Sequence, residues 1–262
     1  MDFVVLTIFP DMCRPFWEQG MVRRGIDQGL VTAQAMDIRE FTSDRHRSTD
    51  DTPYGGGCGM VMTPEPLAAA IREAKTRVPE AKTVFLTPQG RPFNQRMAEE
   101  LSGLPGLILV CGRYEGVDER ISRELVDMEI SLGDFILTGG ELGALVVMDA
   151  VARLLPGVLG GETSAAKDSF SDGLLEYAQY TRPRTFEGEE VPEVLLSGHH
   201  GNIETWRHED ALVRTFLKRP DLLHEKRLTA FELDLLKKWR GDVDTIIRTQ
   251  TLCGSGSPSG GE

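Results

Sequence analysis

Short apolar runs alternate with amphipathic segments along the first half of the chain. Runs rich in Val, Ile, Leu and Phe, bounded by Gly, Pro and polar residues, predict buried strands at Phe3–Ile8, Lys82–Leu86, Leu107–Cys111 and Phe135–Leu137. Leu67, Ile71 and Ala74 have helical spacing after a Pro-rich start, which predicts a helix over Pro64–Val78. This alternation of strand and helix predicts an α/β fold with a mostly parallel sheet.

A Gly-Gly turn at Gly139 and Gly140 leads into Ala144–Leu155, a segment so apolar that we expect a buried helix. Asp149 and Arg153 interrupt this segment four residues apart, and therefore lie on one face of the helix. Glycines in a turn let a ligand approach the backbone closely, because no Cβ intervenes. The glycine turn together with the charged pair indicates a ligand site.

The pattern changes at Gly157–Gly173, which has the composition of turns. A loop of this length is usually functional or a domain connector, and we expect it to be both. Beyond it the chain becomes helical: Asn202 is a candidate N-cap, Pro220 begins a further helix, and Thr229–Glu232 fits a capping box. We divide the chain into a domain at 1–160, a linker at 161–174, a helical domain at 175–248 and a disordered tail at 249–262.

The net charge of −12 is not that of a generic nucleic-acid binder. Any contact with RNA would depend on local basic clusters, for which the alternative is a solvated charged face. These clusters are Arg39, Arg45, His46 and Arg47, and later Arg182, Arg184, Arg214, Lys218 and Arg219.

Cysteine usage and hydropathy indicate a reducing, aqueous compartment. Cys13, Cys58, Cys111 and Cys253 lie far apart and form no CxxC motif, so we expect free thiols. We recognise no signal peptide and no apolar run long enough for a membrane span. A cytoplasmic protein without membrane association is expected.

Four polar turns follow apolar runs, at Thr87–Gly90, Cys111–Gly116, Leu132–Asp134 and Thr138–Gly140. One such turn alone is most often ordinary, but a set at the carboxyl ends of parallel strands favours a small-molecule site. The sequence lacks GxxxxGK[ST], which excludes a P-loop. Tyr54–Gly59 does not complete GxGxxG, and we interpret it as a mobile lid or a tight turn.

Three other features keep two interpretations each. Asp168, among serines in the linker, is either a general base or a solvated carboxylate. Arg153 either stabilises charge on a substrate or pairs with Asp149. The histidines His199, His200 and His208 lack further ligands at a recognisable metal spacing, so no metal site is predicted and surface or capping roles are favoured.

Eight motifs occur together in order over nearly the whole chain: Ile8-Phe-Pro-Asp-Met, Tyr54-Gly-Gly-Gly, Thr87-Pro-Gln-Gly, Cys111-Gly-Arg-Tyr-Glu-Gly-Val-Asp-Glu-Arg, Gly133-Asp-Phe-Ile-Leu-Thr-Gly-Gly-Glu-Leu, Asp168-Ser-Phe, Tyr180-Thr-Arg-Pro and Ser197-Gly-His-His. With them the chain closely resembles the bacterial tRNA (guanine-N1)-methyltransferases of the SPOUT class. These enzymes modify the guanosine immediately 3′ of the anticodon, position 37.

The resemblance implies an α/β domain whose carboxyl part forms a trefoil knot, followed by a linker and a small all-helical domain that binds tRNA. It also implies a homodimer in which S-adenosyl-L-methionine lies bent in the knot of one subunit and the other subunit's linker supplies the base. The family is linked to Mg²⁺, although the sequence shows no ligand cluster for this ion.

By the same resemblance, the residues around the methyl donor are Leu86, Pro88, Gly112, Tyr114, Leu132, Gly133, Phe135, Leu137, Gly139 and Gly140. Glu115 would lie near the cationic end of the donor. The residues expected at the tRNA substrate are Glu176, where relatives often have Asp, with Arg182, Tyr54 and Ser164.

Asp168 and Arg153 match the catalytic pair of the family. Guanine N1 carries a proton at neutral pH, so Asp168 would remove it as general base while the methyl group is transferred. Negative charge then shifts toward guanine O6, where Arg153 would meet it. Holding the two reactants in line would supply a large part of the rate enhancement.

Three positions depart from the family pattern. Cys58 stands where relatives usually have proline, Phe135 where many have tyrosine, and Gly143 where proline is common. Phe135 removes a hydroxyl contact to the donor. Two alternatives to the expected function stay open: a SPOUT enzyme that methylates another RNA position, and a catalytically silent RNA-binding protein of the same fold.

Overall fold

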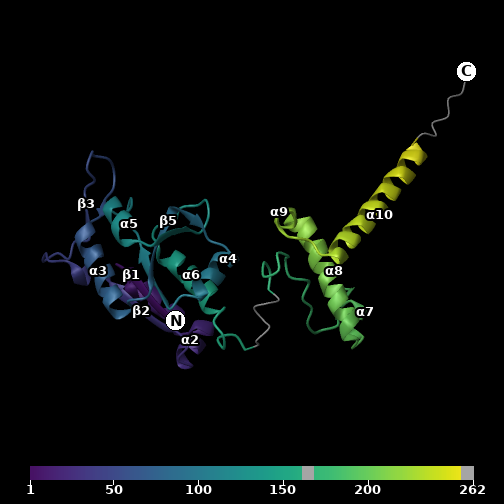
Figure 1. The fold of residues 1–262 in the computed structure, drawn as a ribbon, viewed down its shortest axis with the longest axis horizontal. Coiled ribbons are helices and arrows are strands. Elements are labelled where there is room, and N and C mark those ends of the chain that lie inside the picture. Colours follow the sequence, from purple (N-terminus) through teal and green to yellow (C-terminus); the bar gives the residue numbers. More distant parts are fainter. Residues whose placement is uncertain (161–167, 255–262) are drawn as a thin grey trace, which may run out of the picture. The chain divides into compact units, whose positions relative to one another are not determined.

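The structure is a computed structural model that describes residues 1–160 and 168–254, without the side chains of 249–254. It divides into two compact units, Met1–Ala165 and Ala166–Glu262 (Figure 1). The predicted boundaries at 160, 174 and 248 stay predictions. The first half of the predicted linker, 161–167, lies outside the described residues.

A five-stranded sheet with the order β2-β1-β6-β5-β7 forms the centre of the first unit. All its neighbouring strands are parallel, which confirms the predicted α/β fold with a mostly parallel sheet. The strands are β1 (Asp2–Thr7), β2 (Thr32–Asp37), β5 (Lys82–Pro92), β6 (Gly106–Cys111) and β7 (Met128–Ser131). Two short strands, β3 (Asp50–Asp51) and β4 (Val61–Met62), pair separately.

Successive side chains of a strand point to opposite faces of the sheet. Because the central strands are apolar at successive positions, both faces are apolar and helices cover both. Phe3 and Val5 of β1 pack with one core, and Val4 and Leu6 with the other. The first core is covered by α1 (Pro10–Trp17), α2 (Gly20–Asp27), α4 (Gln95–Ser102) and α6 (Glu141–Ala152). The second is covered by η1 (Ile38–Phe41), α3 (Pro64–Arg77) and α5 (Glu119–Leu125) (Figure 1).

The structure confirms the helix expected at Pro64–Val78 and corrects one strand. Phe135–Leu137 is not a strand: the strand lies just before it, at β7, and Phe135, Ile136 and Leu137 are 53%, 82% and 39% exposed. Three consecutive apolar residues near Gly133 can belong to a loop as well as to a strand. The predicted apolar helix forms as α6, although Leu142 and Val146 on it are exposed.

The second unit is built from α7 (Glu193–Leu196), α8 (His200–Lys218), α9 (Pro220–Glu225) and α10 (Ala230–Gly254) (Figure 1). A small hairpin of β8 (Thr185–Phe186) and β9 (Glu189–Glu190) means that the unit is not all-helical as expected. Its core centres on Leu174, Ala211 and Leu212. The helix α10 takes in residues 249–254, and the remainder of the predicted tail lies outside the described residues.

Two of the three predicted helix starts in this unit are confirmed. Pro220 begins α9. The Thr229 N–H donates to the Glu232 carboxylate at 2.6 Å, and the Glu232 N–H donates to Thr229 Oγ1 at 3.2 Å, which is the reciprocal capping box. Asn202 was wrong as an N-cap, since α8 starts at His200 after an extended His199.

Cys13, Cys58 and Cys111 are free thiols, as predicted. Within the described part of the chain, no helix combines the length and the apolar character needed to span a bilayer.

Candidate functional site

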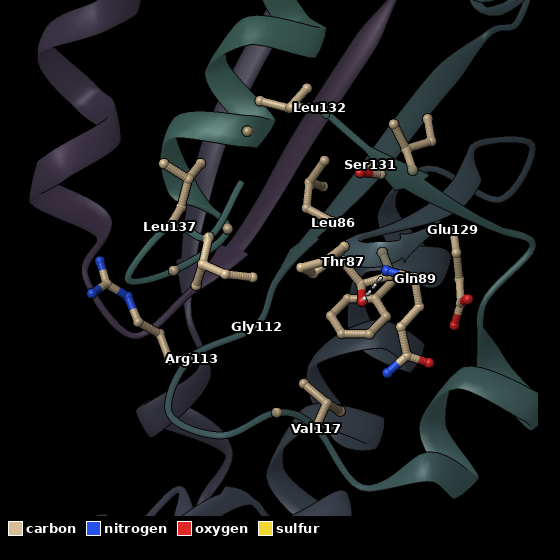
Figure 2. Close-up of a pocket in the computed structure, with 18 of the residues that line it drawn as sticks. Leu86, Thr87, Gln89, Gly112, Arg113, Val117, Glu129, Ser131, Leu132 and Leu137 are labelled. Atoms are coloured by element: carbon tan, nitrogen blue, oxygen red, sulfur yellow. Dashed lines mark hydrogen bonds between the residues drawn. The ribbon is translucent and has the colours of Figure 1, made fainter. Parts of the chain in front are cut away.

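A cavity of about 470 Å³ lies at the carboxyl ends of β5, β6 and β7, which are adjacent in the sheet. Its walls are the bulged part of β5, residues 87–90, and the loops that follow β6 and β7, residues 112–117 and 132–140. Figure 2 shows Leu86, Leu132 and Leu137 on one side of it and Val117 and Gln89 on the other. A crevice at the carboxyl edge of a parallel sheet is where α/β proteins bind ligands.

All eleven residues expected around the methyl donor line this one cavity. They are Leu86, Pro88, Gly112, Tyr114, Glu115, Leu132, Gly133, Phe135, Leu137, Gly139 and Gly140. That they bind the donor stays a prediction. Phe135 and Gly143, two of the three departures from the family pattern, also line the cavity.

A buried ion pair holds two of the cavity loops together. Glu141, at the first position of α6, has a side chain only 1% exposed, and its carboxylate lies 2.9 Å from Arg113 Nη2. Arg113 Nε donates to the same carboxylate at 3.0 Å, and Thr7 Oγ1 donates to it at 2.7 Å. The start of α6, the end of β1 and the loop after β6 therefore meet at one carboxylate.

The Arg113 guanidinium makes further contacts. Its Nη1 donates to the Thr138 carbonyl at 3.3 Å, and its Cζ lies 4.7 Å from the centre of the Phe9 ring. In Figure 2 the Arg113 side chain points away from Val117 and Gln89, toward the N-terminal segment drawn in purple. Arg113 thus holds the 138–140 loop through the Thr138 carbonyl, and its guanidinium does not point toward the centre of the cavity.

The carboxylate of Glu141 also affects two neighbouring thiols. Burial, and then the negative charge of Glu141, raises the pKa of Cys111 well above its usual value. The same two causes raise the pKa of Cys13 to about 11. Both thiols therefore stay neutral, and neither is a candidate nucleophile.

The two glycines before α6 are needed for close backbone contact. The Gly140 N–H donates to the Gly112 carbonyl at 2.9 Å, and residues 113 and 139 form an antiparallel bridge. A Cβ on Gly140 would lie 2.7 Å from Cys111 Cα, and one on Gly139 would lie 2.1 Å from Arg113 Nε. These loops pack so tightly that a methyl group does not fit without movement.

We expect Gly140→Ala to weaken donor binding at least tenfold, about 1.4 kcal/mol, because the new Cβ meets backbone and displaces the 138–140 loop. The dissociation constant of S-adenosylhomocysteine, measured by calorimetry, checks this. Gly103→Ala is the matched control, since its Cβ would meet only the Glu100 carbonyl, at 3.6 Å. Equal affinity in both variants would show that close contact at Gly140 does not shape the cavity.

The glycine loop at Tyr54–Gly59 leads into a segment that packs against the 112–117 loop. The Glu115 N–H donates to the Met60 carbonyl and the Met62 N–H donates to the Gly116 carbonyl, each at 2.9 Å. Gly55, Gly56 and Gly57 have φ of +86°, +77° and +127°, a conformation that side chains disfavour. The repeated glycines are thus explained by tight turns beside the cavity, one of the two interpretations that the sequence allowed.

The remaining predicted site residues are not gathered at this cavity. Arg153 is the C-cap of α6 in the first unit, where its N–H donates to the Asp149 carbonyl at 3.1 Å. Tyr54 is fully exposed. In the second unit Asp168 is half-buried at the start of a turn, where its carbonyl accepts from the Ser171 N–H.

Glu176 and Arg182 also belong to the second unit. The Glu176 N–H donates to Ser169 Oγ at 2.9 Å, and Arg182 lines a separate cavity of that unit. Ser164 lies outside the described residues.

Several polar residues of the cavity were not predicted. Glu129 lines it and accepts a hydrogen bond from Ser122. Gln89 lines it from the bulge of β5, where its N–H donates to Thr87 Oγ1 (Figure 2). Nothing in the sequence marks Glu129 as a site residue; it only precedes the buried Ile130. Among the described residues, no group of three or more His, Cys, Asp and Glu side chains is arranged to hold a metal ion.

Comparison with known proteins identifies the family. Residues 1–225 match the family described as tRNA (Guanine-1)-methyltransferase TrmD. A tRNA (guanine-N(1)-)-methyltransferase of Desulfatibacillum aliphaticivorans is 54% identical over 254 residues, 97% of each chain, and one of Syntrophotalea carbinolica is 51% identical over 94% of this chain and 99% of its own.

Among solved structures, the tRNA (m1G37) methyltransferase from Aquifex aeolicus is 44% identical, with a TM-score of 0.70 over 86% of this chain and 95% of that one. This structural similarity agrees with the sequence matches, which extend over most of the chain. The chain belongs to the tRNA (guanine-1)-methyltransferase family.

Proposed function

We propose that this protein transfers the methyl group of S-adenosyl-L-methionine to N1 of guanosine 37 in tRNA. The observation that carries the proposal is the single cavity at the ends of β5, β6 and β7, lined by every residue that family resemblance places at the donor. A methyltransferase of this family uses S-adenosyl-L-methionine, and its relatives are named for the guanine N1 reaction.

The cavity suits the donor in size and in chemistry. About 470 Å³ lies within the usual range for small-molecule sites. The glycine-rich walls leave backbone N–H and carbonyl groups accessible to an adenosine, and Leu86, Leu132 and Leu137 offer apolar surface to its ring. The carboxylates of Glu115 and Glu129 are available to a cation. When bound, the donor supplies an electrophilic methyl group that needs alignment and no activation.

The protein must free the lone pair of guanine N1, which is protonated at neutral pH. We propose that Asp168 takes this proton and that Arg153 stabilises the charge that develops at O6. Glu176, Arg182, Tyr54 and Ser164 are proposed to contact the tRNA. The target base must leave the anticodon-loop stack to reach the donor.

A methylation assay with unmodified tRNA transcripts and labelled donor tests the proposal. We expect label on transcripts with guanosine at position 37 and none on matched transcripts with adenosine there. Label at another position would favour an enzyme that methylates a different RNA position. No transfer to any RNA would favour a catalytically silent RNA-binding protein.

We also propose a homodimer with each active site shared between subunits. The support within the first unit is an exposed apolar pair on α6: Leu142 and Val146, four residues apart on one face, are 54% and 47% exposed. Neighbouring apolar side chains on an exposed helix face favour a protein partner.

Mixing Asp168→Asn and Arg153→Ala protomers should restore activity to about a quarter of wild type, if each site takes Asp168 from one chain and Arg153 from the other. About half of randomly mixed dimers are then heterodimers, each with one intact site. Native mass spectrometry confirms the mixing, and the methylation assay measures recovery. Mixed dimers with no activity above either parent would contradict a shared site.

Other features are proposed on the same family membership. They are the trefoil knot, the domain boundaries at 160, 174 and 248, tRNA binding by the second unit and a cytoplasmic location. The family's link to Mg²⁺ carries over without a predicted metal site, and assays with and without EDTA test whether the ion takes part.

A further inference from the structure

The second unit contains its own cavity of about 470 Å³, between the segment 177–184 and the helices α7 and α8. Apolar side chains of these helices, including Leu195 and Ile203, contribute to its lining. Aromatic and cationic side chains add to it: Tyr177 and Tyr180 line the cavity together with three arginines. In a chain of net charge −12, this cavity is a local concentration of positive charge.

The three arginines are only partly neutralised. Arg207 Nη1 lies 2.8 Å from Glu204, and Arg184 lies at long distances, 3.6 and 4.0 Å, from Glu190 and Glu193. Arg182 forms no ion pair among the described residues. The lining of the cavity therefore carries positive charge, and among the described residues it includes no carboxylate.

One buried donor in the lining also lacks an acceptor. Arg207 Nε is buried and finds no hydrogen-bond partner within the part of the chain that the structure describes. A buried N–H without an acceptor costs about 1–3 kcal/mol, so such groups commonly have a ligand or water as partner. This observation is independent of the charge of the cavity: Arg207, one of its lining residues, has a donor that no protein group of the described chain satisfies.

The aromatic rings are placed for stacking. The Arg207 guanidinium lies 4.8 Å from the centre of the Tyr177 ring, and Tyr180 lies 6.3 Å from Trp206. Tyr180 is nevertheless 49% exposed, so the residue keeps surface that another planar group can cover. Unstacked bases in single-stranded RNA stack on tyrosine rings and on guanidinium planes, while their phosphates pair with arginine.

We propose that this cavity binds one unstacked nucleotide of the tRNA other than the target guanosine, with the base on Tyr180 and the phosphate at Arg182. The inference rests on the proposed function, which makes tRNA the substrate. An acidic peptide would also satisfy the arginines, but it would leave the open ring of Tyr180 without a planar partner. A nucleotide uses both the charge and the ring.

Binding of full-length protein to an unmodified tRNA transcript tests the site. We expect Tyr180→Ala and Arg182→Gln each to raise the tRNA dissociation constant at least tenfold by fluorescence anisotropy. Tyr180→Phe keeps the ring and should bind within about twofold of wild type. Phe186→Ala is the matched control, because Phe186 is 66% exposed in the same unit and outside the cavity. The affinity for S-adenosylhomocysteine should be unchanged in all four variants.

A series of abasic transcripts, one for each single-stranded position of the tRNA, identifies the bound base. At that position, wild type and Tyr180→Ala should bind the abasic tRNA equally, since the stacking partner is missing in both. If no position removes the effect of Tyr180→Ala, the ring does not stack on a base and the proposal is overturned.

The failure of this inference is distinguishable from that of the proposed function. If the wild-type protein methylates no tRNA, the proposed function fails. If it methylates tRNA and the Tyr180 and Arg182 variants bind tRNA as tightly as Phe186→Ala does, the nucleotide site is wrong while the function stands. Thermal melts identical to wild type ensure that weak binding is not loss of fold.

Discussion

Replacing Asp168 by asparagine is expected to lower kcat for tRNA methylation by roughly 10²–10⁴-fold, the range that a general base contributes. The asparagine side chain has nearly the same size and can still accept a hydrogen bond, but it cannot take the proton of guanine N1. Donor affinity should stay within about twofold of wild type, because the bulge of β5 and the loops after β6 and β7 form the cavity without Asp168. Single-turnover rates and calorimetry with S-adenosylhomocysteine measure the two quantities.

Asp172→Asn is the matched control for this experiment. Asp172 is a carboxylate four residues along the same turn, 57% exposed and 3.7 Å from Lys226, and its replacement should leave kcat within about twofold. A general loss of negative charge or of turn structure would affect both variants. Near-normal turnover in Asp168→Asn would show that another group removes the proton.

The location of the cavity could be predicted from the sequence because its determinants are local. Each of three buried runs is followed at once by a polar, glycine-bearing turn, and parallel strands bring such turns to one edge. The sequence thus indicated the turns at Thr87, Cys111 and Leu132, although the strand before Leu132, β7, was not itself predicted. The strand order β6-β5-β7 makes these turns neighbours. This order could not be predicted from the hydrophobic pattern, because it depends on crossovers between distant segments.

The electrostatics of the site were less predictable. Asp149 and Arg153 drew attention because they interrupt an apolar helix, yet Asp149 is exposed and the fully buried charge is Glu141. Glu141 stands at the start of α6, where a first-turn acid is expected for the helix dipole alone. Its partner Arg113 is 28 positions away, in another motif, and only the strand order brings the two together.

Two local errors have the same origin. The strand β2 was not predicted because Thr32–Asp37 has few apolar residues, and as an edge strand it buries only Met36. Phe135–Leu137 has the composition of a strand, but its side chains line the cavity. Composition reports how apolar a segment is, and it does not report whether a sheet or a ligand site uses the apolar side chains.

Glu141→Gln is expected to reduce the free energy of unfolding by about 3–5 kcal/mol, the cost of removing one partner of a buried ion pair. The neutral amide leaves Arg113, whose side chain is 16% exposed, without a full countercharge. Urea unfolding measures the change. The exposed pair of Arg23 and Asp27, at 51% and 55% side-chain exposure, is the control. Asp27→Asn should cost only about 0.2–1 kcal/mol, and an equal cost in both variants would contradict the burial argument.

A double variant separates the contribution of this ion pair to the stability of the protein from its effect on the shape of the cavity. Replacing both charges, as Arg113→Met with Glu141→Leu, should recover much of the lost stability, because apolar side chains of similar size often replace a buried pair without cost. Donor binding should stay at least tenfold weaker, since the Thr138 carbonyl no longer has the guanidinium as donor and the 138–140 loop is no longer fastened to the end of β6. If the double variant binds S-adenosylhomocysteine as wild type does, the pair stabilises the fold but does not position the loop, and the backbone bridge between residues 113 and 139 alone shapes the cavity.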